Sequence, residues 1–121
     1  MTKNPVTIHS LTARLIEFRD ARNWQRFHSL KDLILSLNLE ASEMLELAQW
    51  KNDEDFEKSM TDSGPKAALE EECADVFLYL LLIAEKSGID LLAAASAKID
   101  KNAKKYPVEK ARGNARKYTE L

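Results

Sequence analysis

The chain has 121 residues, of which 45% are hydrophobic and 31% charged, and its formal net charge is −2. This composition is typical of one soluble globular domain over residues 1–121, and the small negative charge argues against a general nucleic-acid binder, which needs a basic excess. The longest uninterrupted apolar run, Val76–Ala84, is too short to span a membrane, and the chain starts with no apolar signal-peptide core, so we expect a cytoplasmic protein.

Few breaks interrupt the sequence, because it contains only three glycines and three prolines. Such a chain favours a few long helices over many short strands. We expect the first helix over residues 7–21, where apolar residues recur at helical spacing, followed by an aromatic-rich connector over 23–28. A second helix is expected over 29–50, with Ser29 as its N-cap.

The third expected helix starts at Pro65, whose fixed φ suits the first helical position, and ends at Gly88. Before it, the acidic segment 51–64 has room for one short helix around 55–60. The second half of the third helix, Val76–Ala84, is apolar on all sides. We therefore expect it to be buried by the rest of the chain together with a second subunit.

A fourth helix is expected over residues 90–105, followed by a basic, irregular tail. Four long helices with short links predict an all-α protein built as a four-helix bundle, without a domain boundary. Cys73 is the only cysteine, which excludes an internal disulfide. Its apolar surroundings favour a small core residue over a nucleophile.

Two pairs of acidic residues carry most of the information about function. Glu40 and Glu43 are three apart on the second expected helix, and Glu72 and Asp75 are three apart on the third. Residues at this spacing share one helix face, so each pair can converge on one ion. Acids on helices are also commonly solvated or salt-bridged, and either pair alone would favour that interpretation. Two such pairs bordering apolar stripes favour a shared metal site, because an unpaired carboxylate there is costly.

The ligand types select the metal. No histidine lies three or four residues from these acids, so the Glu-x-x-His pattern of di-iron bundles is missing. Ligation by carboxylates alone suits a hard cation, Mg²⁺ or in its place Mn²⁺. Such an ion typically bridges protein carboxylates to phosphate oxygens.

Cations and aromatic rings suggest the remaining parts of a nucleotide site. On the fourth expected helix, Lys98, Asn102 and Lys105 lie on one face, which is either an ordinary solvated face or a surface for a polyphosphate. Bases stack on aromatic rings, and the candidates are Trp24, Phe27, Trp50 and Tyr79. Each ring is otherwise a core or interface residue. His28, next to this cluster, is either a residue flanking the second helix or a ligand.

The motif Glu40-Ala-Ser-Glu43, followed after a spacer by Glu72-Cys-Ala-Asp75 and an apolar run, resembles the E-x-x-E…E-x-x-D signature of the MazG-like, all-α NTP pyrophosphatase superfamily. The similarity covers nearly the whole chain and extends to the dCTP pyrophosphatase branch. It departs from the family at Leu30 and Asp32, where proline and asparagine are frequent. The similar blocks outside the signature are Glu17-Phe18, Arg22-Asn23-Trp24, Phe27-His28, Gln49-Trp50-Lys51, Asp100-Lys101-Asn102, Lys105-Tyr106-Pro107, Ala111-Arg112-Gly113 and Lys117-Tyr118-Thr119.

The resemblance implies an all-α, oligomeric enzyme, a dimer or a tetramer made of two dimers. It implies that the enzyme hydrolyses a nucleoside triphosphate, such as dCTP or a modified deoxynucleotide, to the monophosphate and pyrophosphate with Mg²⁺, which serves to clean the nucleotide pool. The four acids would be the catalytic Mg²⁺ ligands. Trp24 and Trp50 would form a base pocket between subunits. The sugar and phosphate site would be lined by Tyr79, Asn102, Lys105 and Tyr106, with Arg112 and Lys117 reaching the phosphates from the tail.

Two other functions fit the same residues. The chain could be a non-enzymatic helical interaction module whose acids are structural, or a metal-dependent phosphatase of another kind. Added Mg²⁺ distinguishes the metal enzyme from the interaction module, because the ion should raise the thermal stability of the enzyme and not that of the module. The reaction product distinguishes the pyrophosphohydrolase from another metal-dependent phosphatase.

Overall fold

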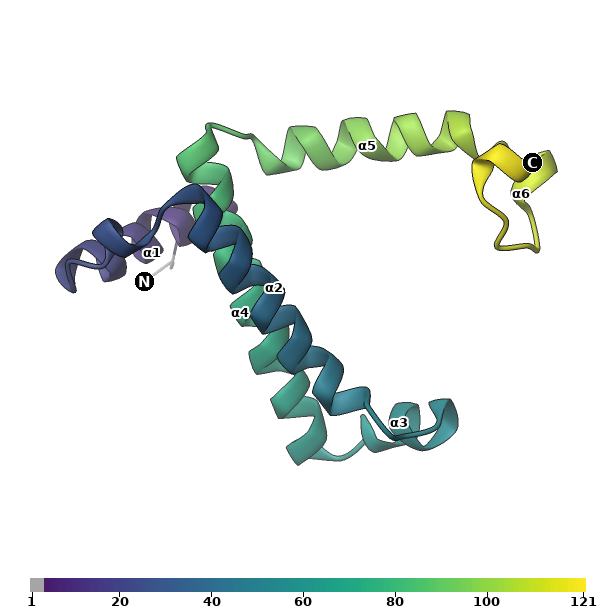
Figure 1. Cartoon of the computed structure of the whole chain (residues 1–121), viewed down its shortest axis with the longest axis horizontal. Coiled ribbons are helices and arrows are strands. Elements are labelled where there is room, and N and C mark those ends of the chain that lie inside the picture. Colours follow the sequence, from purple (N-terminus) through teal and green to yellow (C-terminus); the bar gives the residue numbers. More distant parts are fainter. Residues whose placement is uncertain (1–3) are drawn as a thin grey trace. The chain divides into compact units, whose positions relative to one another are not determined.

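The computed structural model describes residues 4–121, and this part of the chain is helical without strands. The prediction of an all-α protein is therefore confirmed. The described residues form six α-helices and two short 3-10 helices, so a count of four helices is not confirmed, although the four predicted long helices are all present. They are α1 (Ile8–Ala21), η1 (Gln25–Phe27), α2 (Leu30–Ala48), α3 (Asp53–Ser59), α4 (Ser63–Ser87), α5 (Leu91–Lys105), α6 (Val108–Ala111) and η2 (Tyr118–Glu120) (Figure 1).

The chain separates into two compact units, residues 1–88 and 89–121. The first unit holds α1 to α4, and the second holds α5, α6 and η2. A four-helix bundle would need α5 to pack on the helices of the first unit. The bundle and the single domain over 1–121 therefore stay predictions.

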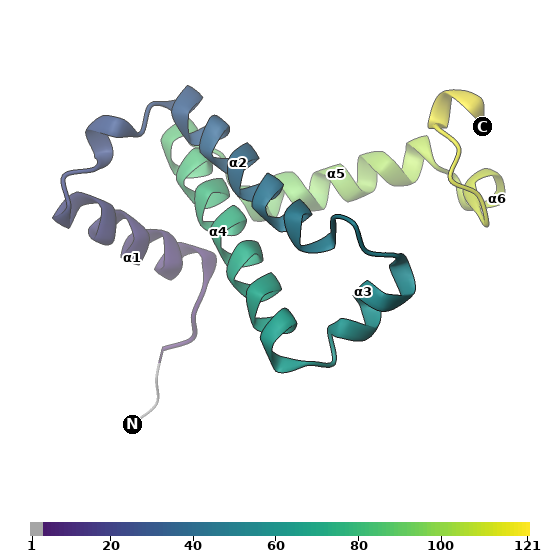
Figure 2. The ribbon, with the colours of Figure 1, turned by 60° about the horizontal axis from the view of Figure 1, so that its bottom comes forward.

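In the first unit, α2 and α4 lie side by side and run antiparallel, and α1 packs on α4 (Figure 2). The buried side chains of the described residues are Leu33 on α2 and Leu81, Leu82 and Ala84 on α4. All four lie near the start of α2 and the end of α4, so the core occupies one end of this helix pair. The acidic residues at 40, 43, 72 and 75 lie about one and a half to three turns farther along the same two helices.

Local capping explains where α2 and α4 end and begin. The Ser29 side chain accepts a hydrogen bond from the backbone N–H of Asp32 at 3.0 Å, as expected of an N-cap. Gly88 ends α4 with a left-handed φ of 66°, which confirms its predicted place. The predicted start of α4 at Pro65 is wrong by two residues. The helix already starts at Ser63, because a proline needs no N–H partner in the first turn and the preceding Gly64 has no Cβ to clash with the proline ring.

The shorter elements refine the sequence-based prediction. The short helix expected around 55–60 is α3, which Asn52 caps by accepting from the backbone N–H of Asp55 at 2.8 Å. The tail after α5 is not wholly irregular, because it contains α6 and η2. Cys73 is exposed, so its expected place in the core is wrong. Among the described residues, none of the helices has the length and apolar composition that crossing a membrane requires.

Candidate metal centre and adjoining pocket

Three glutamates meet where α2 and α4 lie against each other. Glu40 and Glu43 share one face of α2 because they are three residues apart, and Glu72 faces them from α4. One carboxylate oxygen of each glutamate lies within 4.8 Å of one oxygen of the other two. The structure thus brings together three of the four acids that the sequence predicted as metal ligands.

The electrostatics of this cluster favour a bound cation. Burial raises the pKa of Glu40 to about 7, helped by a hydrogen bond with Glu43 and by the charges of Glu43, Asp75 and Glu72. Burial also raises the pKa of Glu72, as do the charges of Glu43 and Asp75. Glu40 Oε2 and Glu72 Oε2 are buried without a hydrogen-bond partner. A divalent cation ligated by these oxygens would supply the missing partner and offset the repulsion, so the residues fit such an ion.

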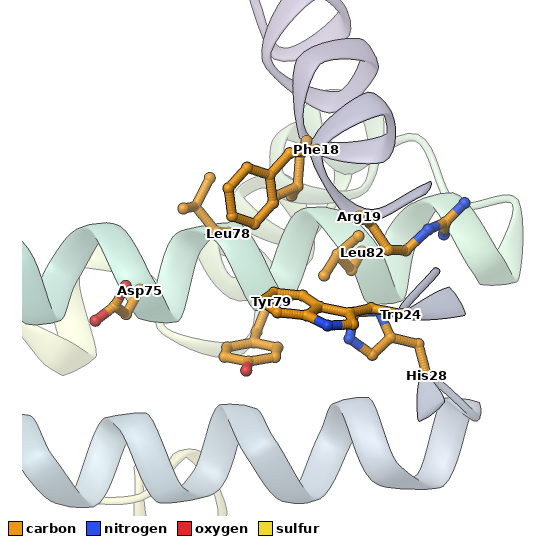
Figure 3. Close-up of a pocket in the computed structure, with 9 residues that line it drawn as sticks. Phe18, Arg19, Trp24, His28, Asp75, Leu78, Tyr79 and Leu82 are labelled. Atoms are coloured by element: carbon orange, nitrogen blue, oxygen red, sulfur yellow. The ribbon is translucent and has the colours of Figure 1, made fainter. Parts of the chain in front are cut away.

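Asp75 connects this cluster to a pocket beside it. It lies about one turn after Glu72 on α4 and is not one of the three acids that meet within 4.8 Å. Because it is three residues after Glu72 on the same helix, it lies near the cluster, and its charge raises the pKa of both Glu40 and Glu72. Asp75 also lines the pocket, as Figure 3 shows.

The pocket has a volume of about 240 Å³ and is formed by α1, the connector after it and α4. Three predicted base-pocket or substrate residues, Trp24, His28 and Tyr79, line it together (Figure 3). The sequence-based prediction missed several residues of its lining. The apolar ones follow the helical spacing of α1 and α4, which could have revealed them. Leu15, Phe18, Arg19, Leu78 and Leu82 are the missed residues.

Arg19 is a charged group in a mostly apolar wall, and no sequence signal marked it. Its side chain is 17% exposed and forms an ion pair with Asp20 at 2.9 Å. A longer contact of 3.8 Å to Glu85 links α1 to α4. Burial, and then the charges of Arg19 and Lys86, lower the pKa of His28, which favours its neutral form. Its Nδ1 atom is buried without a partner. The pocket therefore combines aromatic rings with a few polar groups, as small-molecule sites do.

Trp50 lies apart from this pocket. It follows α2 at the end opposite Trp24 and is 92% exposed. Its φ of 68° is left-handed, which is costly for a bulky residue. The structure does not bring Trp50 together with Trp24 in one chain.

The remaining predicted substrate residues belong to the second unit. Within this unit, the rings of Tyr106 and Tyr118 meet edge to face, with centroids 6.2 Å apart. Lys105 Nζ lies 4.8 Å from the Tyr118 ring centroid. These contacts fold the tail back onto the end of α5, and the role of the unit in substrate binding stays a prediction. Its predicted substrate residues are Lys98, Asn102, Lys105, Tyr106, Arg112 and Lys117.

Comparison with known proteins gives three concordant similarities. The model of the MazG-like family matches residues 35–121. The dCTP pyrophosphatase 1 proteins of Homo sapiens and Bos taurus are 38% identical over 115 residues, which is 95% of this chain and 68% of each relative. A crystal structure of a pyrophosphatase from Archaeoglobus fulgidus DSM 4304 superposes with a TM-score of 0.76 at 37% identity, covering 88% of this chain and 98% of that one. Each similarity spans most of the chain.

Proposed function

The chain belongs to the MazG-like family and is a nucleoside triphosphate pyrophosphohydrolase, and we propose that its substrate is a deoxynucleotide such as dCTP or a modified form of it. The products are the nucleoside monophosphate and pyrophosphate, and the physiological role is removal of unwanted nucleotides from the pool. The observation that carries this proposal is a cluster of three carboxylates with unpartnered oxygens, next to a pocket lined by aromatic rings.

Glu40, Glu43, Glu72 and Asp75 hold the metal in this proposal, and the metal is Mg²⁺, for which Mn²⁺ can substitute. The support is the set of hard oxygen ligands and the raised pKa of Glu40 and Glu72, which a cation would bring back toward the ordinary range. When bound, a divalent cation offsets the charge of a triphosphate and activates water for attack.

The aromatic pocket holds the base. Trp24 and Tyr79 offer ring faces for stacking, while the apolar residues around them exclude water from the base. Asp75 lies both in this pocket and near the carboxylates, so a nucleotide bound by its base here directs its phosphates toward the acidic cluster. His28 lines the same pocket, and its lowered pKa favours the neutral form, which adds no charge next to the base.

Trp50 completes the base pocket of a partner subunit in this proposal. Its strained backbone conformation is typical of a functional site. Its exposed ring is free to be covered by another subunit of an assembly. The phosphates are bound by cations and polar groups of residues 98–117. This segment contains eight lysine or arginine residues and only two acidic ones. The residues proposed for this role are Lys98, Asn102, Lys105, Tyr106, Arg112 and Lys117.

Hydrolysis in ¹⁸O-labelled water tests the bond that is broken. Attack at the α-phosphorus should give labelled monophosphate and unlabelled pyrophosphate. Label in the pyrophosphate would mean attack at the β-phosphorus and would contradict the proposal. Release of a nucleoside diphosphate and single phosphate would mean attack at the γ-phosphorus and a phosphatase of another kind. A panel of ribo- and deoxynucleoside triphosphates with Mg²⁺, assayed for pyrophosphate, then identifies the substrate.

A further inference from the structure

Three side chains form a stacked series at the end of α1. The guanidinium carbon of Arg22 lies 3.7 Å from the centroid of the Phe18 ring, which is the geometry of a close cation–π contact. The Phe18 ring meets the Trp24 ring edge to face, with centroids 5.7 Å apart and an interplanar angle of 75°. The same guanidinium lies 5.9 Å from the Trp24 ring centroid. Arg22 therefore contacts Phe18 directly and Trp24 mainly through Phe18.

Helix geometry fixes Arg22 in this position. Arg22 is four residues after Phe18, so the two side chains share one face of the helix. Its Nη1 donates a hydrogen bond to the Phe18 carbonyl oxygen at 2.9 Å. Arg22 is also the C-cap of α1, where the helix dipole favours a positive charge. Backbone and ring of Phe18 thus hold the same guanidinium.

Trp24 depends on side-chain packing for its orientation. It lies in the connector after α1, preceded by Asn23 with a left-handed φ of 54°. A hydrogen bond from its backbone N–H to the Arg19 carbonyl oxygen at 3.1 Å fixes the main chain. Trp24 is 44% exposed, and Phe18, whose ring packs on the indole, is 46% exposed. Both rings therefore have room to rotate unless another group restrains them.

We propose that Arg22 is a positioning residue for nucleotide binding, which acts by stacking on Phe18 and thereby holding the Trp24 indole at the wall of the pocket. This inference rests on the proposed function, in which Trp24 stacks on the base. Phe18 and Trp24 both line the pocket, as Figure 3 shows, whereas Arg22 does not. Arg22 therefore influences the nucleotide through Trp24 and not by contact.

Fluorescence of the free protein tests the positioning step without any assay of activity. In a Trp50→Phe background, Trp24 is the only tryptophan. Replacing Arg22 by leucine should raise the quenching of Trp24 by acrylamide, because the freed indole spends more time in solvent. Unchanged quenching would overturn the proposal. Arg26→Leu is the matched control, because the Arg26 guanidinium also lies over a phenylalanine ring, that of Phe27 at 4.8 Å, but outside the pocket.

A double-mutant cycle tests the link to nucleotide binding. Arg22→Leu should raise the KM for the triphosphate about three- to tenfold, with kcat within about twofold, on the scale of one aromatic or cation–π contact. In a Trp24→Ala background, the same substitution should change KM little, because its route of action has been removed. Arg26→Leu should leave KM unchanged in both backgrounds.

The outcomes separate this inference from the proposed function. An equal rise of KM with and without Trp24 would mean that Arg22 contacts the nucleotide itself, which overturns the positioning role. A lower melting temperature with unchanged KM would mean a purely structural role, which also overturns it. If the wild-type protein has no pyrophosphohydrolase activity, the proposed function fails, and increased quenching in Arg22→Leu would still establish that Arg22 positions Trp24.

Discussion

A buried carboxylate oxygen that lacks a hydrogen-bond partner lowers the stability of a protein, and the acidic cluster has two of them, on Glu40 and Glu72. A third acid, Glu43, lies within the same 4.8 Å cluster and adds repulsion. Without a ligand this arrangement has no structural benefit. Its energetic cost is understandable if the cluster is built to bind a cation, because the ion replaces the missing hydrogen bonds and neutralises the charges.

The raised pKa of Glu40 predicts how the metal-free protein responds to pH. Its pKa is about 7 when folded and 4.5 in the unfolded reference, so the folded state binds a proton more tightly. The contribution of Glu40 to the free energy of unfolding is full below pH 4.5 and is lost as pH rises through 7. Glu40→Gln in EDTA should therefore stabilise the protein more at pH 8 than at pH 5.

Melting temperatures of both proteins at the two pH values measure this effect. The comparison with Glu40→Gln is needed because the lowered pKa of His28 makes stability rise with pH, which is opposite to the effect of Glu40. The difference between the two proteins gives the contribution of Glu40 alone. Mg²⁺ should raise the melting temperature of the wild type at pH 8 by more than that of the variant. An equal effect of Glu40→Gln at pH 5 and pH 8 would contradict the assignment.

Asp75 offers the sharpest test of the acidic residues, because it lies between the cluster and the pocket. Asp75→Asn keeps the size of the side chain and removes its charge. We expect kcat/KM with Mg²⁺ to fall by about two orders of magnitude, on the scale of a lost electrostatic contact in the transition state. The metal-free fold should keep or gain thermal stability, since repulsion with Glu40 and Glu72 is relieved. Glu70→Gln, an exposed acid on the same helix, is the control and should keep its activity.

At the scale of helices, the sequence predicted what depends on local patterns. The spacing of apolar residues and the caps Ser29 and Gly88 gave the bounds of the long helices to within about two residues. The early start of α4 escaped prediction because Pro65 normally occupies the first helical position, whereas here Gly64 before it permits an earlier start. The spacing of acidic pairs identified three residues that meet. Arg19 was missed because its burial depends on packing between α1 and α4.

Gly88 gives a prediction about how α4 ends. Its φ is 66°, and no described residue other than its chain neighbours comes within 4 Å of the position that a Cβ would occupy, so backbone strain opposes a side chain. Gly88→Ala should lower the free energy of unfolding by about 1 kcal/mol. Gly88→Asn should cost less, since asparagine tolerates this conformation better. Ser87→Ala, inside the helix, should have a neutral or slightly stabilising effect. Chemical unfolding of the three variants checks the order, and an equal effect of alanine at 87 and 88 would contradict it.

At the scale of the whole molecule, the described residues contain a small core. Leu33, Leu81, Leu82 and Ala84 are its buried hydrophobic members, which is few for a chain of this length. Large apolar side chains on both long helices of the first unit stay open to solvent, among them Leu39, which is 64% exposed. The association of units and of subunits depends on these long-range surfaces, and local sequence patterns carry little information about it.

The exposed apolar surface predicts that the protein is a homo-oligomer, a dimer or a tetramer. Leu35 and Leu45 on α2 are 51% and 65% exposed, and Phe77 and Leu80 on α4 are each 37% exposed. Soluble monomers rarely expose apolar side chains so extensively along adjacent helices. A second copy would cover this surface with an interface above the standard size of about 1,600 Å². It would also bring a second Trp50 within reach of the proposed base pocket.

Light scattering at micromolar concentration measures the assembly. We expect the mass of a dimer or tetramer for the wild type and a smaller species for Leu35→Glu, because a charge buried at an apolar interface costs several kcal/mol. Leu35 lies outside the carboxylate cluster and the pocket, so a loss of activity on dissociation would come from separation of the subunits. The enzyme should then lose affinity for the nucleotide while its carboxylates still bind Mn²⁺ in the dissociated protein. A monomeric wild type that is fully active would contradict both the assembly and the base pocket shared between subunits.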